Sequence, residues 1–250
     1  MGPTIKYRIS EKAVTLAWEE KIDIDIHRQV MLADELISNF PFAGWIENVP
    51  GYHTLTIFFD PYIIVKQTRS SDAFQFVEDY LDHIIASPED PASFETRRVR
   101  VPVCYDPEFG IDLEEVSGLL KIGIDDIIHE HCNTPYHVFM LGFQPGFPYM
   151  GMLPDVLKIP RKAVPSIKIP AGTVAIGGQQ TGIYPFDSPG GWYALGRTPI
   201  ELFVNGKAFF EPGDEVIFYP IDLDEYHKMK SIERTEKTKQ SGHKREKKQS

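Results

Sequence analysis

The side chains best suited to ligand binding lie in residues 142–197, where glycine, proline and aromatic residues crowd together. Arg161 and Arg197 are the candidate cations, because each follows a Pro or Gly that could hold its stem. Glycine allows positive φ and close backbone approach, whereas proline fixes φ and removes a hydrogen-bond donor. A backbone so tightly specified either closes a small β-barrel or lines a pocket. For each arginine, bonding to loop carbonyls is the alternative to ligand binding.

Amide and aromatic side chains share the same stretch. Gln144 and Gln179 could hydrogen-bond a ligand, or they could satisfy polar groups of the turns. Phe147, Tyr149 and Trp192 could form a pocket wall, although aromatic side chains of a small barrel also build its core. The pattern predicts a pocket and leaves its chemistry open.

Motifs for metal binding and nucleophilic catalysis are weak. His129, His131 and His137 with Cys132 do not have an established ligand spacing, and no CxxC accompanies them. The sequence contains neither Gly-x-Ser-x-Gly nor a P-loop, and Ser188 lies in a Ser-Pro-Gly-Gly turn. We therefore predict no metal site in this chain.

The composition is that of an ordinary globular protein, with 42% hydrophobic and 25% charged residues among 250. No run approaches the roughly 18 apolar residues of a membrane helix, and the first residues do not resemble a signal peptide. Cys104 and Cys132 belong to no motif, which fits free thiols in a reducing cytoplasm. We expect a cytoplasmic protein with no membrane partner.

The net charge of −10 conceals a basic C-terminal segment. Residues 228–250 contain nine Lys or Arg and three Glu, without apolar periodicity. We predict a disordered basic tail over 226–250, with an electrostatic arm as the alternative. The strongly acidic remainder argues against nucleic-acid binding, because phosphate contacts need a basic face.

The first part of the chain reads as strands mixed with helices. Short apolar or alternating runs predict strands over 5–9, 14–18, 45–49 and 52–59. Apolar residues at helical spacing predict helices over 23–39 and 72–86, the second capped by Asp72. This order predicts a small α+β domain over 1–90, with both helices on one face of an antiparallel sheet.

The pattern changes after residues 87–93, which hold two prolines and form the predicted boundary. Residues 99–103 alternate like a strand, and short helical patterns cover 112–120 and 124–131. The rest consists of short β-segments separated by Gly/Pro turns, up to a last strand over 215–219. We predict a mostly-β, small closed barrel over 94–225.

Five ordered turn motifs carry a family resemblance. They are GFQPGFPYMG at 142–151, IPR at 159–161, IPAGTVAI at 169–176, Tyr184-Pro185 with SPGGW at 188–192, and GRTP at 196–199. Together they resemble the family of the 5-oxoprolinase B subunit, also called the KipI family or allophanate hydrolase subunit 1. The resemblance covers roughly 5–220 and implies an α+β N-terminal domain followed by a cyclophilin-like β-barrel.

The resemblance also implies a function. Most members look like one component of an ATP-dependent 5-oxoprolinase, which opens 5-oxoproline to glutamate with a homologous-barrel C subunit and a separate A subunit. ATP would be handled by the complex. A relative inhibits a sensor histidine kinase, and others belong to allophanate hydrolase or urea amidolyase. The resemblance leaves open whether this chain is catalytic or regulatory.

A 5-oxoproline site needs a cation for the carboxylate, donors for the lactam carbonyl and an apolar wall. Arg161 and Arg197 could supply the cation. The glutamines named above could supply the donors, and the aromatic residues could supply the apolar wall. His131 matches a position that the family tends to hold as His, and could act as a general base. A core or helix-capping histidine is the alternative. Asp187 is the candidate carboxylate near the pocket mouth.

The chain departs from the family pattern at one position. Members typically carry a second Pro-Arg before the Pro-Ala-Gly motif, where this chain has Pro165-Ser166. Lys168 could supply the missing charge, although a lysine cannot reproduce the two-pronged geometry of a guanidinium.

Overall fold

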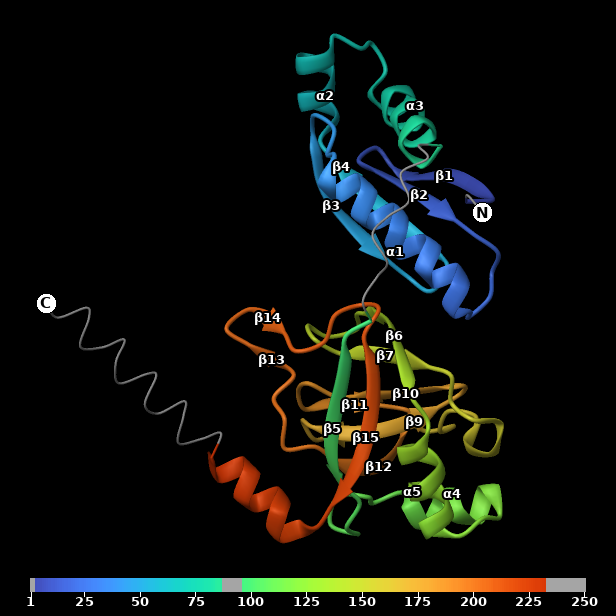
Figure 1. Ribbon diagram of the computed structural model, residues 1–250, viewed down its shortest axis with the longest axis vertical. Helices are drawn as coiled ribbons and strands as arrows, with labels where there is room; N and C mark the ends of the chain where they lie inside the picture. The colour runs from blue at the N-terminus through green and yellow to red at the C-terminus, as the bar shows by residue number, and fades with distance from the viewer. Residues whose placement is uncertain (1–2, 87–95, 233–250) are drawn as a thin grey trace, which may run out of the picture. The chain divides into compact units, whose positions relative to one another are not determined.

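The computed structural model describes residues 3–86 and 96–232, and it divides into two compact units, Met1–Arg97 and Arg98–Ser250 (Figure 1). The predicted boundary over 87–93 lies outside the described residues. Within the described ranges, no helix is long and apolar enough to cross a membrane.

The N-terminal unit is an antiparallel sheet with helices. Its strands follow the order β1-β2-β4-β3 and span β1 (Ile5–Ser10), β2 (Ala13–Ala17), β3 (Trp45–Pro50) and β4 (Thr54–Phe59). The helices are α1 (Ile24–Asn39), α2 (Pro61–Thr68) and α3 (Ala73–Ile85). Inward side chains of β2 and β4 form one buried cluster with α1 and α3, which confirms the predicted α+β arrangement.

The start of each helix in the N-terminal unit follows from a local signal. Asp23, Asp60 and Asp72 each accept hydrogen bonds from backbone N–H groups of the first turn. Helix α2 was not predicted, because Asp60-Pro61 reads as a turn after β4. The same pair forms an N-cap followed by proline in the first turn, where its missing N–H costs nothing.

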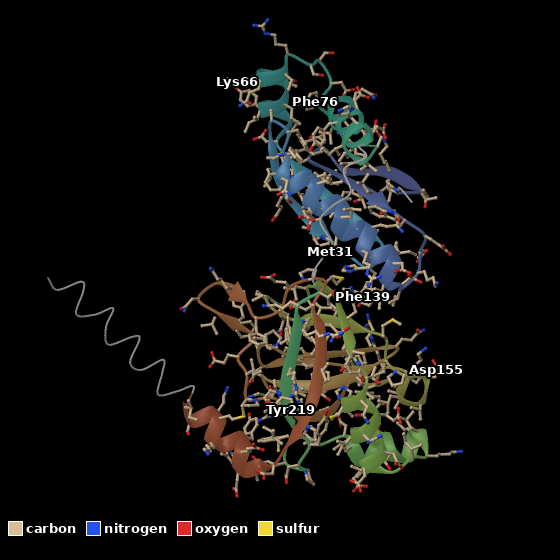
Figure 2. The ribbon with its side chains drawn as sticks, viewed as in Figure 1. Met31, Lys66, Phe76, Phe139, Asp155 and Tyr219 are labelled. Atoms are coloured by element: carbon tan, nitrogen blue, oxygen red, sulfur yellow. The ribbon has the colours of Figure 1, made fainter. Side chains whose placement is uncertain are left out.

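The C-terminal unit is a closed barrel with strand order β10-β7-β6-β15-β5-β12-β9, as the turn pattern predicted. These strands span β5 (Arg98–Cys104), β6 (Tyr136–Leu141), β7 (Pro148–Gly151), β9 (Thr173–Gly177), β10 (Gln180–Ile183), β12 (Tyr193–Arg197) and β15 (Glu215–Ile221). The last strand runs parallel to β5, in register from Glu215–Arg98 to Ile221–Cys104. On β15, Phe218 belongs to the buried barrel cluster. The next residue, Tyr219 (labelled in Figure 2), packs against a second buried cluster and lies beneath the Arg100 guanidinium.

Short elements surround the barrel. Helices α4 (Leu113–Leu120) and α5 (Ile124–Asn133) follow β5, and a 3₁₀ turn spans Asp155–Leu157. Two ribbons pair β8 (Ser166–Ile169) with β11 (Ser188–Gly190), and β13 (Phe203–Val204) with β14 (Lys207–Ala208).

The structure corrects the predicted C-terminal tail. Residues 223–232 form a helix after β15, drawn in orange-red, so residues 226–232 of that segment are helical (Figure 1). Tyr226 is buried there, with its ring 4.5 Å from that of Phe109. One apolar row, Leu223, Tyr226 and Met229, docks the helix, and the charges around it concealed that row in the sequence. The rest of the predicted tail, 233–250, lies outside the described residues.

Candidate functional site

The smaller of two pockets described in the C-terminal unit brings together four of the predicted binding residues, Phe147, Tyr149, Arg161 and Trp192. Its volume is about 250 Å³, and its lining includes Phe143, Phe147, Tyr149, Arg161, Tyr184 and Trp192. The Arg161 guanidinium carbon lies 5.7 Å from the centre of the Trp192 ring, and the Phe147 and Trp192 rings are 5.7 Å apart. The pocket is therefore an aromatic cage with a cation at its exposed edge.

Glycines of the β9–β10 hairpin make room for the Trp192 indole. A Cβ at Gly177 would lie 2.6 Å from Trp192 Cδ1, and one at Gly182 would lie 2.9 Å from Trp192 Cζ3. Because such distances are below any real carbon contact, only glycine lets the indole pack this closely on these strands. Phe147, Tyr184 and Trp192 accordingly form a buried cluster of their own, separate from the barrel core.

The phenols of this pocket remain protonated at neutral pH. Burial raises the pKa of Tyr184 to about 12. Burial also raises the pKa of Tyr149, against the opposing effect of the nearby Arg161 charge. A protonated phenol can donate a hydrogen bond, so the cage contains donors as well as apolar walls.

The larger pocket, of about 580 Å³, contains the other predicted cation. Its lining includes Glu108, Phe109, Asp187, Arg197, His227 and Lys230. Trp192 precedes β12 and Arg197 ends it, so five residues at about 3.3 Å each place them roughly 16 Å apart. The two predicted arginines therefore serve different pockets.

Asp187 is tied to the loops that border the larger pocket. One carboxylate oxygen lies 2.8 Å from the Lys168 ammonium, and the other accepts the Ala171 N–H at 2.9 Å. Hydrogen bonds from Lys168 and Ala171 lower the pKa of Asp187, with smaller contributions from the charges of Lys168 and Arg197. An ionised, already bonded carboxylate is suited to holding the loop and poorly suited to accepting a proton.

Ser166 has a partner of its own. Its hydroxyl accepts a hydrogen bond from the Lys162 ammonium at 3.2 Å. Lys168, the expected substitute for the missing arginine, instead pairs with Asp187. The charge next to Ser166 is therefore that of Lys162.

The structure places His131 in the barrel core. The ring is fully buried and stacks on Phe218 at 4.6 Å. Its Nε2 lies 3.0 Å from Thr181 Oγ1 and its Nδ1 lies 2.8 Å from Tyr105 Oη. Burial lowers the pKa of His131 to about 3. This is the core position that the sequence left open as the alternative to a general base, and it lines neither pocket.

The two predicted glutamines also lie outside both pockets. Gln179 is exposed in the turn between β9 and β10. Gln144 has a buried Oε1 without a hydrogen-bond partner in the turn before Phe147. Among residues 3–86 and 96–232, no group of His, Cys, Asp or Glu is arranged to hold a metal ion.

The sequence did not point to several residues that line the pockets. Tyr184 belongs to the Tyr-Pro turn motif and lines the smaller pocket, but no binding role was predicted for it. Phe109, His227 and Lys230 come from two segments that meet only because helix 223–232 docks on Phe109. The repeated spacing of Leu223, Tyr226 and Met229 was the available signal for that helix.

Comparison with known proteins agrees with the motifs. A family model described as carboxyltransferase domain, subdomain C and D, matches residues 5–210. The 5-oxoprolinase B subunit of Bacillus subtilis (strain 168) is 37% identical over 235 residues, which cover 91% of this chain and 98% of that relative.

Solved structures share the fold. The crystal structure of TTHA0988 superposes with a TM-score of 0.71 at 30% identity, covering 84% of this chain and 40% of that chain. The Kluyveromyces lactis urea amidolyase matches over 89% of this chain and 15% of its own, with a TM-score of 0.67. At 17% identity, this second likeness shows the fold alone. The chain therefore belongs to the carboxyltransferase subdomain C and D family that its turn motifs resemble, the family of the 5-oxoprolinase B subunit.

Proposed function

We propose that this chain is the B subunit of an ATP-dependent 5-oxoprolinase and that its smaller pocket holds the lactam. The reaction would convert 5-oxo-L-proline, ATP and water to L-glutamate, ADP and phosphate. The observation that carries the proposal is the meeting of Phe147, Arg161 and Trp192 in one cage of about 250 Å³. The name of the Bacillus subtilis relative supports the same assignment.

The chemistry of the cage suits a small lactam acid. Arg161 is exposed at its edge and could bind the carboxylate, with the ring lying against the aromatic walls. The phenols of Tyr149 and Tyr184 are donors for the lactam carbonyl. Arg161 is the one charged side chain among the described residues that line this pocket, which favours a ligand with a single negative charge.

The cage holds substrate-binding groups without a complete reactive set. Its described lining contains no carboxylate and no histidine, and His131 lies in the core. We propose that a homologous-barrel C subunit and a separate A subunit supply the remaining groups and handle ATP. Opening the lactam then depends on the assembled complex.

A reconstitution experiment tests this function. The chain would be purified with its A-subunit and C-subunit partners, and ATP hydrolysis measured as 5-oxo-L-proline is added. We expect substrate-stimulated hydrolysis, and a KM roughly 10–100-fold higher in Arg161→Gln, because a charge-assisted bond contributes about 1.5–3 kcal/mol. Arg100→Gln is the matched control, since Arg100 lines neither pocket.

Two results would count against the proposal. A complex whose ATP hydrolysis does not respond to 5-oxo-L-proline would remove the 5-oxoprolinase function. Wild-type kinetics in Arg161→Gln would remove the lactam from the smaller pocket while leaving the function in place.

Exposed apolar side chains beside the cage favour a protein partner. Phe143 at the pocket is 62% exposed, and Val164 and Ile167 nearby in sequence are 81% and 93% exposed. Such a surface fits the homologous-barrel C subunit, and it equally fits a sensor histidine kinase held by a regulatory chain. A tight kinase complex without 5-oxoproline-dependent ATP hydrolysis would favour the regulatory alternative. An allophanate hydrolase or urea amidolyase role stays a prediction.

A further inference from the structure

The larger pocket differs from the aromatic cage in its charges. Positive charge comes from Arg197 and from Lys230 on helix 223–232. Negative charge comes from Glu108, Asp187 and Glu201. A pocket that carries both signs matches a ligand that carries both signs.

Arg197 is held rigidly and has unused hydrogen-bonding capacity. As the last residue of β12, its backbone pairs with Cys104 of β5 and Thr173 of β9. Its guanidinium lies 4.6 Å from the centre of the Phe109 ring, and its Nε is buried without a hydrogen-bond partner. Within residues 3–86 and 96–232, no hydrogen bond or ion pair engages this guanidinium. Because Arg197 lines the pocket and its charge is not engaged, the guanidinium is available to an anionic ligand there.

The Pro-Ala-Gly loop brings its backbone against Arg197. Gly172 has a φ of +81°, and a Cβ there would lie 2.7 Å from the Thr198 carbonyl oxygen and 3.3 Å from Arg197 Cγ. A glycine is therefore required for the loop to pass beside the arginine stem. The loop and strand together fix where the guanidinium sits, which is what a preformed anion site needs.

Glu108 supplies the opposite charge from a structured turn. Its backbone N–H donates to the Asp106 carboxylate at 2.9 Å, next to Phe109 beneath Arg197. Glu108 and Arg197 thus line the same pocket. A ligand with an ammonium and a carboxylate on the same carbon could meet these two groups together.

We propose that the larger pocket binds a free α-amino acid, with the carboxylate on Arg197 and the ammonium at Glu108. The site is separate from the lactam cage, whose one charged group fits a ligand without an ammonium. L-Glutamate is a suitable probe, because it carries the required groups and is the product of the proposed reaction. The binding itself does not rest on that function.

Calorimetric titration of the full chain with L-glutamate tests the site. We expect binding that weakens roughly 10–100-fold in Arg197→Gln, since a guanidinium–carboxylate bond is lost. Glu108→Gln should weaken L-glutamate binding and leave glutarate binding unchanged, because glutarate has no ammonium. Arg100→Gln should bind L-glutamate as the wild type does, and circular dichroism would show that each variant is folded.

Three results would overturn the proposal: no L-glutamate binding by the wild type, equal binding of L-glutamate and glutarate, or tighter binding of inorganic phosphate. Unchanged binding in a folded Arg197→Gln chain would do the same. These results leave 5-oxoproline-stimulated ATP hydrolysis untouched. Conversely, a reconstituted complex without that activity, in which this chain still binds L-glutamate through Arg197, would contradict the proposed function alone.

Discussion

Lys162 and Asp112 form an ion pair that is almost closed to solvent, with 2.8 Å between Nζ and Oδ1 and side-chain exposures of 13% and 11%. The other Asp112 oxygen accepts the Ala194 N–H at 2.7 Å, so the pair joins the segment before β8 to strand β12. Ser166 accepts a further bond from Lys162. A second arginine at position 166 would place another cation beside this buried charge.

Removing only one of the two charges of this pair should strongly destabilise the protein. Asp112→Asn leaves the Lys162 charge buried without compensation, so we expect the free energy of unfolding to fall by about 3–5 kcal/mol. The double change Asp112→Asn with Lys162→Met should cost less than the single one, because both charges are gone. Urea unfolding followed by circular dichroism measures both variants.

An exposed pair provides the matched control. Asp155 lies 2.6 Å from Lys158 and its side chain is 94% exposed. Asp155→Asn should change the unfolding free energy by less than about 1 kcal/mol. A similar loss for Asp112→Asn and Asp155→Asn would mean that the Lys162–Asp112 pair is not buried in solution.

Stability should fall in mild acid because of His131. Its folded pKa of about 3 lies below the ordinary value of 6.5, so only the unfolded chain takes up a proton between them. The stability that the neutral ring contributes is complete above pH 6.5 and is lost as the pH falls toward 3. By linkage, the loss reaches about 2 kcal/mol between pH 7 and pH 5.

Comparison with His131→Gln isolates this effect. We expect the variant to lose less stability than the wild type between pH 7 and pH 5, although it starts from a lower value because the Tyr105 and Thr181 bonds are disturbed. In nuclear magnetic resonance spectra, the His131 ring should stay neutral at pH 5. Parallel losses in both proteins, or a ring that titrates near pH 6.5, would place His131 outside the core.

The parts of the fold that the sequence predicted are those with a local physical cause. Gly and Pro set the turns between barrel strands, and Asp72 marks the start of α3 with bonds to two backbone N–H groups. Helix 223–232 was missed because its docking depends on Phe109, which lies far away in the sequence. Such an element is stabilised by tertiary contact, and its charged outer face resembles a solvated tail.

The candidate site shows the same division. Phe147, Arg161 and Trp192 were predicted as one binding group, and the structure brings them into one cage. Arg197 could not be separated from that group in advance, because the separation comes from the length and direction of β12. The position of His131 depended on which face of α5 met the barrel, and the sequence did not decide between a core ring and an accessible base.

Ligand binding in the cage should change tryptophan fluorescence. The chain has three tryptophans, of which Trp192 lines the smaller pocket beside Arg161. We expect 5-oxo-L-proline to shift or quench the emission of the wild type, because a ligand in the cage would change the surroundings of the indole. Trp192→Phe should remove the signal and Trp45→Phe, in the N-terminal unit, should retain it. A signal that survives Trp192→Phe would place the ligand elsewhere.

Adding a methyl group at Gly172 should both destabilise the protein and weaken ligand binding in the larger pocket. Gly172→Ala meets both a φ of +81° and the carbonyl oxygen of Thr198, so the loop must move away from Arg197. Gly178→Ala is the matched control, since Gly178 has a φ of +67° and nothing within 4 Å of an added Cβ. In the control, the free energy of unfolding should fall only by the left-handed backbone penalty of roughly 1–2 kcal/mol. We expect Gly172→Ala to lower the free energy of unfolding by more than the control does, as measured by urea unfolding, and to weaken L-glutamate binding. Equal losses of stability in the two variants would show that the loop does not press on Arg197.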